Sequence, residues 1–183
     1  MVPLVVEQLP DWLSRGSVDL AISVADLPEM FERTLVKRQR YMVLMSESHP
    51  LANEQLTLSS YADAPRAVVA GDSGATLLRA AEERAGVHAL PTLAVGHFAT
   101  LPQLLTGDSP FIAAAPGTIA DEWASGWGLH QAPLPFPMDP IELVLYRRQT
   151  SQHLGALDWF HQQVAREVTT SRGQFGALRG DAT

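Results

Sequence analysis

The first part of the chain alternates short apolar runs with a helical pattern. Residues 2–6 and 18–23 are runs of mainly apolar side chains, and each predicts a strand. Between them, residues 7–15 place three apolar side chains on one helical face, and Gly16 stands where a helix commonly ends. Strand, helix and strand in this order form a βαβ unit, which predicts a parallel sheet.

The same alternation continues to the end of the chain. Strands are predicted at residues 41–45, 66–70, 90–95, 111–116, 129–136 and 141–148, and helices at residues 59–62, 77–84, 97–107, 117–126 and 151–168. Ser59 is the predicted cap of the shortest helix. The last helix carries an apolar stripe formed by Leu157, Phe160, Val164 and Val168. The alternation predicts an α/β fold.

Composition narrows the function. The chain has 13 basic and 20 acidic residues and a formal net charge of -7, which opposes binding to phosphate, so by itself it is predicted to bind DNA poorly. Zero cysteines exclude disulfides, thiolate metal sites and cysteine nucleophiles. The histidines lack the spacing of a metal site, and no glycine-rich phosphate loop with lysine is found, so no metal or cofactor is expected.

Targeting signals are also missing from the pattern. No apolar run reaches the length of a membrane span, and residues 1–10 lack the basic start of a signal peptide. We therefore expect a cytoplasmic protein that does not enter a membrane.

Four segments in sequence carry a resemblance to a known family. RGSVDLAIS contains Gly16 and Asp19, and about twenty residues later RYMVLMSESHPLA ends at Ala52. Further on, VGHFATLPQLLTGDSPFIAAAP predicts a helix ending near Gly107 and a strand running into Pro116, and PLPFPMDPIELVLYRRQTSQHLGALDWFHQQV follows. In this order and spacing the segments resemble the effector-binding domain of LysR-type transcriptional regulators. The last segment is close to the branch that includes regulators of nodulation and of aromatic degradation.

The resemblance implies a fold like that of type 2 periplasmic binding proteins, with two α/β lobes joined by two crossover strands. It would cover residues 1–168, with the first lobe at about 1–65 and 139–168 and the second at about 66–138. The polar residues 169–183 are predicted to form a flexible tail. Homo-oligomers are a further expectation, as is binding of a small effector, aromatic or carboxylate-bearing, between the lobes.

The sequence also departs from this family. It shows no winged helix-turn-helix, so DNA would be bound only through a domain absent from the chain. Residues 2–6 match the family's second strand, so the first strand and first helix of the first lobe are missing from the pattern. Because that first strand is central in a doubly wound lobe, we expect a truncated product whose first lobe lacks a hydrogen-bonding partner.

Candidate effector-binding residues follow from a rule for open α/β sheets, in which ligands bind at the carboxyl ends of strands and near helix N-termini. The loop after residue 70 offers Gly71 and the hydroxyls of Ser73 and Thr76, and its backbone N–H groups could hold a carboxylate. An ordinary capping role explains these residues equally well.

Two further strand ends qualify. One is followed by His97, Phe98 and Thr100, where Phe98 could face an aromatic effector or belong to the core, and the other by Ser23 and Val24.

Other functions stay open at this stage. A transporter's solute-binding protein shares the implied fold, and a non-functional truncated regulator is a third possibility. An enzyme is not expected. Ser73 lies in GDSG, which echoes the nucleophile motif of chymotrypsin-like proteases, but that fold is all-β and a capping role fits the serine better.

Overall fold

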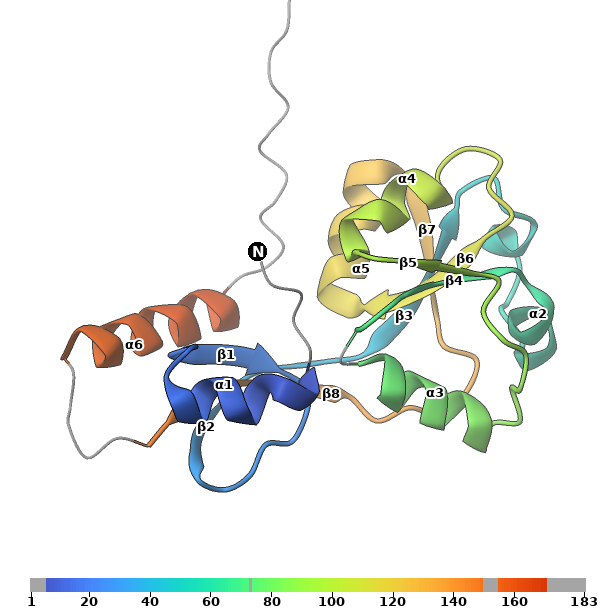
Figure 1. Cartoon of the computed structure of the whole chain (residues 1–183). Coiled ribbons are helices and arrows are strands. Elements are labelled where there is room, and N and C mark those ends of the chain that lie inside the picture. The colour runs from blue at the N-terminus through green and yellow to red at the C-terminus, as the bar shows by residue number, and fades with distance from the viewer. Residues whose placement is uncertain (1–5, 73, 150–154, 171–183) are drawn as a thin grey trace, which may run out of the picture. The chain divides into compact units, whose positions relative to one another are not determined.

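The computed structural model of the chain describes residues 6–72, 74–149 and 155–170 (Figure 1). Contacts divide the chain into two compact units: a smaller unit built from Met1–Gln39 with Ile141–Ser171, and a larger unit spanning Arg40–Pro140. Within the described residues, the chain therefore passes between the units twice, next to residues 39 and 140.

The boundary of the first lobe was predicted wrongly. Residues 40–65 belong to the larger unit rather than to the first lobe, because strand β3 (Tyr41–Ser46) hydrogen-bonds along both edges to strands of the larger sheet. Sequence spacing placed this strand with its neighbours along the chain, whereas its pairing partners come from beyond residue 110.

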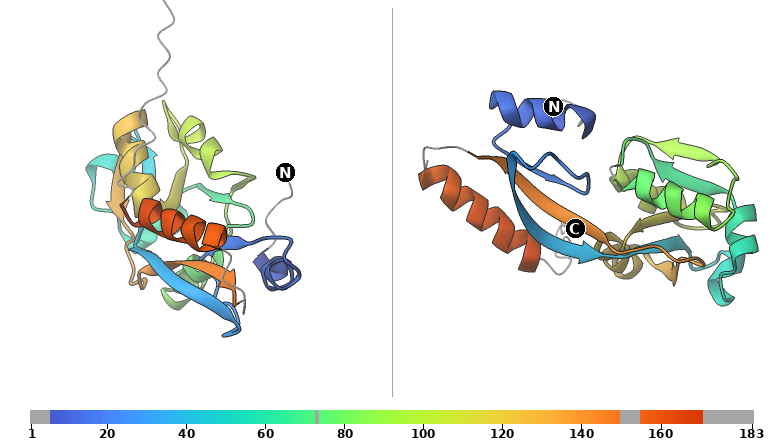
Figure 2. Two further views of the ribbon diagram at one scale, coloured as in Figure 1. Left: turned by 90° about the vertical axis from the view of Figure 1, so that its left-hand side faces the viewer. Right: turned by 90° about the horizontal axis from the view of Figure 1, so that it is seen from below.

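The smaller unit contains an antiparallel sheet of order β1-β8-β2. Its elements in the described residues are the 3₁₀ turn η1 (Val6–Gln8), α1 (Leu9–Arg15), β1 (Leu20–Ser23), β2 (Phe31–Gln39), β8 (Ile141–Arg148) and α6 (Gly155–Thr170). Helix α1 ends as predicted at Gly16, whose φ of 71° is left-handed. It buries Leu9 and Leu13 against one face of the sheet, and α6 lies over the other face (Figure 2).

Three predictions for this unit need correction. Residues 2–5 of the first predicted strand lie outside the described residues, and Val6 begins a 3₁₀ turn. Strand β1 pairs antiparallel with β8 instead of forming a parallel pair. Of the apolar stripe predicted for α6, Leu157, Val164 and Val168 are half-buried on the same side of the helix as the buried His161, whereas Phe160 is 49% exposed.

The larger unit contains a five-stranded mixed sheet of order β5-β4-β6-β3-β7. Besides β3, its elements in the described residues are the 3₁₀ turn η2 (Pro50–Asn53), α2 (Leu58–Asp63), β4 (Arg66–Val69), α3 (Ala75–Arg84), β5 (Leu93–Val95), the 3₁₀ turn η3 (Phe98–Thr100), α4 (Leu101–Leu105), β6 (Ile112–Pro116), α5 (Gly117–Trp127) and β7 (Leu129–Pro133). Strand β4 is parallel to both neighbours, and β3 is antiparallel to both of its own. Thr57, not Ser59, caps α2, because its side chain accepts the N–H of Ser60.

Side chains alternate between the two faces of this sheet. On one face, Ala113 and Ala115 of β6 join Leu44 of β3 and the leucines of α4 in a buried apolar cluster, with α5 alongside. On the other face, Ala114 of β6 and Val68 of β4 look toward α3. The second face is less completely filled, and it carries the pocket described next.

Candidate functional site

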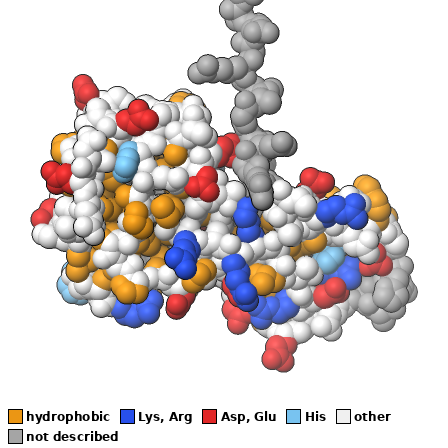
Figure 3. Space-filling model, turned by 180° about the vertical axis from the view of Figure 1, so that it is seen from behind, with side chains coloured by type: hydrophobic (Ala, Val, Ile, Leu, Met, Phe, Trp, Pro, Cys, Tyr) orange, Lys and Arg blue, Asp and Glu red, His pale blue; other side chains and the backbone are white. Residues whose placement is uncertain are grey.

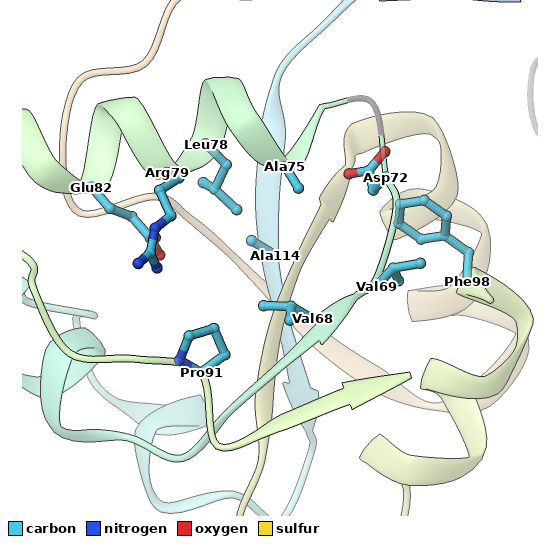
Figure 4. Close-up of a pocket in the computed structure, with 10 residues that line it drawn as sticks. All are labelled: Val68, Val69, Asp72, Ala75, Leu78, Arg79, Glu82, Pro91, Phe98 and Ala114. Atoms are coloured by element: carbon cyan, nitrogen blue, oxygen red, sulfur yellow. The ribbon is translucent and has the colours of Figure 1, made fainter. Parts of the chain in front are cut away.

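A pocket of about 120 Å³ lies between α3 and the sheet of the larger unit (Figure 4). Its walls are mainly apolar, and three charged side chains reach it. The lining residues are Val68, Val69, Asp72, Ala75, Leu78, Arg79, Glu82, Pro91, Phe98 and Ala114. For comparison, an engineered apolar cavity of roughly 150 Å³ accepts benzene, so this pocket suits a single small ring.

Local structure explains why these residues meet. Strands β4 and β6 are parallel neighbours, so Val68 of β4 and Ala114 of β6 lie side by side and form the floor of the pocket. On α3, Ala75, Leu78 and Glu82 are spaced by three and four residues and therefore share one face of the helix. Phe98 comes from the turn that follows β5. The pocket thus lies beside the carboxyl ends of parallel strands, where ligands of α/β proteins commonly bind.

One end of the pocket is formed by Asp72 and Phe98. The Tyr41 hydroxyl donates to Asp72 Oδ2 at 2.8 Å, and the Gly74 backbone N–H donates to Asp72 Oδ1 at 3.1 Å. Burial, followed by the charge of Asp72 and its hydrogen bond, raises the pKa of Tyr41 above its ordinary value. The tyrosine therefore remains a proton donor to the carboxylate throughout the physiological range.

Gly74 allows this arrangement because it has no side chain. A Cβ atom at this position would overlap the Tyr41 hydroxyl. Glycine is required here for close approach of the loop to the ring and not for its backbone angle, because Gly74 is in the ordinary right-handed region.

The other end of the pocket is formed by Arg79 and Glu82. Glu82 is 8% exposed, and its Oε1 accepts the Tyr61 hydroxyl at 2.7 Å. Burial, the charge of Glu82 and this hydrogen bond raise the pKa of Tyr61. Arg79 lies 3.7 Å from the carboxylate of Glu83.

Of the residues predicted for the effector site, the structure brings Phe98 into the pocket. Gly71 and Thr76 flank it on the loop and on the first turn of α3 but do not line it, and Ser73 lies outside the described residues. His97 and Thr100 are exposed on either side of Phe98. These residues therefore stay predictions, with Phe98 the best supported by geometry.

Ser23 and Val24 lie in the smaller unit, at the end of β1. Ser23 is buried and its hydroxyl accepts the N–H of Ala25 at 3.0 Å, which is a local turn contact. Val24 is half-buried. Neither residue contributes to the pocket of the larger unit.

Sequence reasoning missed the charged residues of the pocket. It identified the loop that contains Asp72 but assigned its polar contacts to the hydroxyls. The spacing of Ala75, Leu78 and Glu82 could have indicated a helix face with a buried carboxylate, because an acidic residue on an apolar face is uncommon unless it is hydrogen-bonded.

Within the residues that the structure describes, no helix is both long and apolar enough to cross a membrane, and no group of three or more acidic or histidine side chains could hold a metal ion. A mainly apolar pocket with a few polar groups, beside the strand ends of a sheet, is a common place for an α/β domain to bind a small molecule.

Comparison with known proteins identifies the family. The LysR substrate binding domain matches residues 2–169, and the chain belongs to this family. It is the ligand-sensing domain of a LysR-type transcriptional regulator, with the type 2 periplasmic-binding-protein-like fold that such domains share, and this family is not a family of enzymes. The sequence has no significant match among curated proteins.

Solved structures agree with the family. A protein from Vibrio parahaemolyticus described as a transcriptional regulator is 26% identical, with a TM-score of 0.78, over 92% of this chain and 78% of its own. The regulatory domain of MexT, a transcriptional activator in Pseudomonas aeruginosa, is 29% identical, with a TM-score of 0.72, over 87% and 79%. The effector binding domain of QuiR, solved in complex with shikimate, shares the fold at 16% identity, with a TM-score of 0.69, over 90% and 79%.

Proposed function

We propose that the pocket of the larger unit binds the effector of this regulator, and that the effector is a small compound with an apolar, aromatic body. The observation that carries this proposal is the pocket itself, with Phe98 beside the apolar side chains of β4 and α3. Its volume of about 120 Å³ fits one small ring. The QuiR structure supports the proposal in general terms, because that domain, which has the same fold, holds a ligand built on a single ring, shikimate.

Binding of a neutral probe tests this site. 2-Phenylethanol has the proposed apolar body and no charge, so it tests the pocket without testing its electrostatics. We expect it to raise the melting temperature of the chain, and Phe98→Ala to weaken binding about tenfold, since the removed ring contributes roughly 1–3 kcal/mol of apolar contact. Phe160→Ala is the matched control, because Phe160 is 49% exposed on α6 of the other unit. Equal binding by both variants would contradict the proposed site.

The domain acts without catalysis in this proposal. Binding of the effector would favour one conformation of the regulator over another. The size of that shift would depend on the difference between the effector's affinities for the two conformations. A hydrolase that uses Ser73 is the alternative enzyme. Turnover of an ester substrate that disappears in Ser73→Ala would favour it over a sensor.

We further propose that the domain forms homo-oligomers through the free edge of β5, the last strand of its sheet on that side. Leu93 on this strand is 36% exposed, Leu90 just before it is 72% exposed, and Leu77 on α3 is 44% exposed. An apolar edge strand favours pairing with another chain. Leu93→Lys should lower the mass measured by light scattering, whereas Leu58→Lys, at a comparably exposed leucine of α2, should not.

Contact with DNA is proposed to occur through a winged helix-turn-helix outside these 183 residues, in the cytoplasm. The net charge of -7 supports the proposal that another domain binds the DNA, because a negative charge opposes binding to phosphate. On the face of the molecule in Figure 3, acidic side chains stand among the basic ones. Mobility shifts with the chain alone should show no specific DNA complex at physiological salt.

A further inference from the structure

The start of α3 already contains a carboxylate of the protein. The sequence predicted that the backbone N–H groups of this loop would hold a carboxylate of the effector. In the structure the Gly74 N–H instead donates to Asp72 Oδ1 at 3.1 Å. The described N–H at the entrance to the helix is therefore directed at an internal anion, and Asp72 lines the pocket beside it.

Asp72 can accept more hydrogen bonds than the described residues supply. Its Oδ2 accepts the Tyr41 hydroxyl at 2.8 Å and its Oδ1 accepts the Gly74 N–H, so each oxygen receives one donor from the residues that the structure describes. A carboxylate offers about four acceptor positions. A ligand that enters beside Phe98 thus meets acceptor oxygens at this end of the pocket (Figure 4).

The charges at the opposite end have partners within the protein. Glu82 accepts the Tyr61 hydroxyl at 2.7 Å, and Arg79 lies 3.7 Å from Glu83. Arg79 is the cation that a ligand carboxylate could approach, but it lies at the far end of the pocket from Phe98. The charge next to the aromatic side chain is negative.

We propose that Asp72 determines effector specificity by selecting a compound with a hydrogen-bond donor, an ammonium or hydroxyl group, attached to its apolar body, and by rejecting a carboxylate at that end. This inference rests on the proposed effector site. An ammonium gains a charge-assisted hydrogen bond to Asp72, whereas a carboxylate in the same place brings two like charges together. Discrimination therefore contains both an attractive and a repulsive element.

Tyr41 is the positioning residue in this arrangement. The residue is 4% exposed, and its hydroxyl donates the hydrogen bond that holds the side chain of Asp72 in place. Tyr41 also directly follows Arg40, the first residue of the larger unit. A ligand that changes the orientation of Asp72 thus acts on a side chain of β3 next to the point where the chain enters the unit.

Three probes with the same apolar body test the proposal: 2-phenylethylamine, 2-phenylethanol and phenylacetate. Their dissociation constants are measured by calorimetry on the full 183-residue chain at pH 7. We expect the amine to bind at least about tenfold more tightly than phenylacetate, as one hydrogen bond to a charged group would give, with the alcohol in between. The amide signal of Gly74 in a ¹⁵N spectrum should shift with the amine, because its hydrogen bond ends on Asp72.

Variants then assign the preference to a residue. Asp72→Asn keeps the shape of the side chain and should abolish the difference between amine and acid. Asp121→Asn, on the exposed surface of α5, is the matched control and should keep it. Tyr41→Phe removes the positioning hydroxyl, and we expect it to reduce the preference without reversing it. If Asp72→Asn does not fold, the wild-type ranking and the Gly74 signal decide.

Each outcome has a distinct meaning. Tighter or equal binding of phenylacetate, or a preference that survives in Asp72→Asn, overturns the role of Asp72, while Phe98-dependent binding of the alcohol leaves the proposed effector site standing. Equal binding of alcohol and amine, both above the acid, supports a neutral donor. Failure of all three probes to bind overturns both proposals.

Discussion

Helix α6 of the smaller unit and the helices α4 and α5 of the larger unit are held on their sheets in different ways. In the larger unit, α4 and α5 cover one face through a buried apolar cluster that includes Leu44 and Leu105. In the smaller unit, α6 is attached by charge: Arg147 of β8 reaches Glu32 of β2 at 2.7 Å and Asp158 of α6 at 2.5 Å. The apolar attachment is insensitive to ionisation, whereas the charged one depends on every partner being present and ionised.

The side chains of α6 that face its sheet are consistent with an attachment through polar groups. Its buried side chain is His161, which lies 3.3 Å from the Thr34 hydroxyl, while Trp159 is 62% exposed. The ion pair of Asp158 and the contact of His161 thus keep α6 on its sheet together with apolar side chains that are only half-buried, such as Leu157 and Val164. We expect the attachment of α6 to be the more sensitive to removal of a charge, and the attachment of α4 and α5 to be the more sensitive to removal of a buried apolar side chain.

The largest effect should come from the apolar cluster. Leu44→Ala removes a fully buried side chain from the apolar cluster of the larger unit, and we expect a loss of about 2–5 kcal/mol in the free energy of unfolding. Leu58→Ala, at a leucine 39% exposed on α2, should cost less than about 1 kcal/mol. Chemical denaturation measures both. Equal losses would show that the cluster does not dominate this unit.

Removing the central charge of the smaller unit should have the next largest effect. Arg147→Met leaves Glu32 and Asp158 facing each other without a cation, at a site where the arginine side chain is 18% exposed, and we expect a loss of about 1–3 kcal/mol. Hydrogen exchange should accelerate in α6 but not in α5. Arg148→Met, at the exposed neighbour, is the control; unchanged exchange in α6 would contradict the role of Arg147.

A smaller effect should appear on mild acidification. Burial, together with the charge of Arg147, lowers the pKa of His161 below its ordinary value of 6.5, although Glu32 and Asp158 act in the opposite direction. As the pH falls below 6.5, the unfolded chain binds a proton that the folded chain resists, so stability decreases until the lower, folded pKa is passed. Above pH 7 the histidine is neutral in both states and has no effect.

Melting curves between about pH 7.5 and 5.5 test this sign, over the range in which an ordinary histidine titrates. The decrease should be shallower in His161→Gln than in the wild type. His88→Gln, at an exposed histidine, should follow the wild type and controls for general acid effects. A wild-type chain that becomes more stable at lower pH relative to His161→Gln would reverse the assigned sign.

The smallest effect is expected for an exposed ion pair of the same sheet. Arg38 lies 2.8 Å from Glu142, but the two side chains are 66% and 41% exposed. Water and salt screen such a pair, so Arg38→Gln should change stability by about 0.5 kcal/mol or less. If Arg38→Gln lost as much stability as Arg147→Met, the difference in burial would not explain how much each charge pair contributes to stability.

Apolar runs made most of the fold predictable. The final strand was predicted at the bounds that β8 has, and Gly16 marks the end of α1 as expected. Strand β2 was not predicted, because it contains several charged residues and few apolar ones. A bulge between Leu35 and Lys37 also interrupts the alternation of apolar and polar side chains along this strand. Pairing partners were not predictable either, since period and length do not say which strands meet.

Of the residues that line the candidate pocket, only Phe98 was named from the sequence. The loop around Asp72 and the aromatic Phe98 were both identified, yet the charged lining was not. A hydrogen bond such as that from Tyr41 to Asp72 joins residues 31 positions apart, so no local sequence pattern predicts it. Contacts of this kind become visible when the strands have been placed.

The sheet order of the smaller unit has a consequence for the time course of folding. Strands β1 and β2 do not pair with each other in this sheet; both hydrogen-bond to β8, more than one hundred residues after β1 begins. During synthesis the whole of Arg40–Pro140, which forms the larger unit, is made after β2 and before β8. Strands β1 and β2 therefore have no β8 to pair with until synthesis is nearly complete. Until then their unpaired edges can form incorrect hydrogen bonds with other strands.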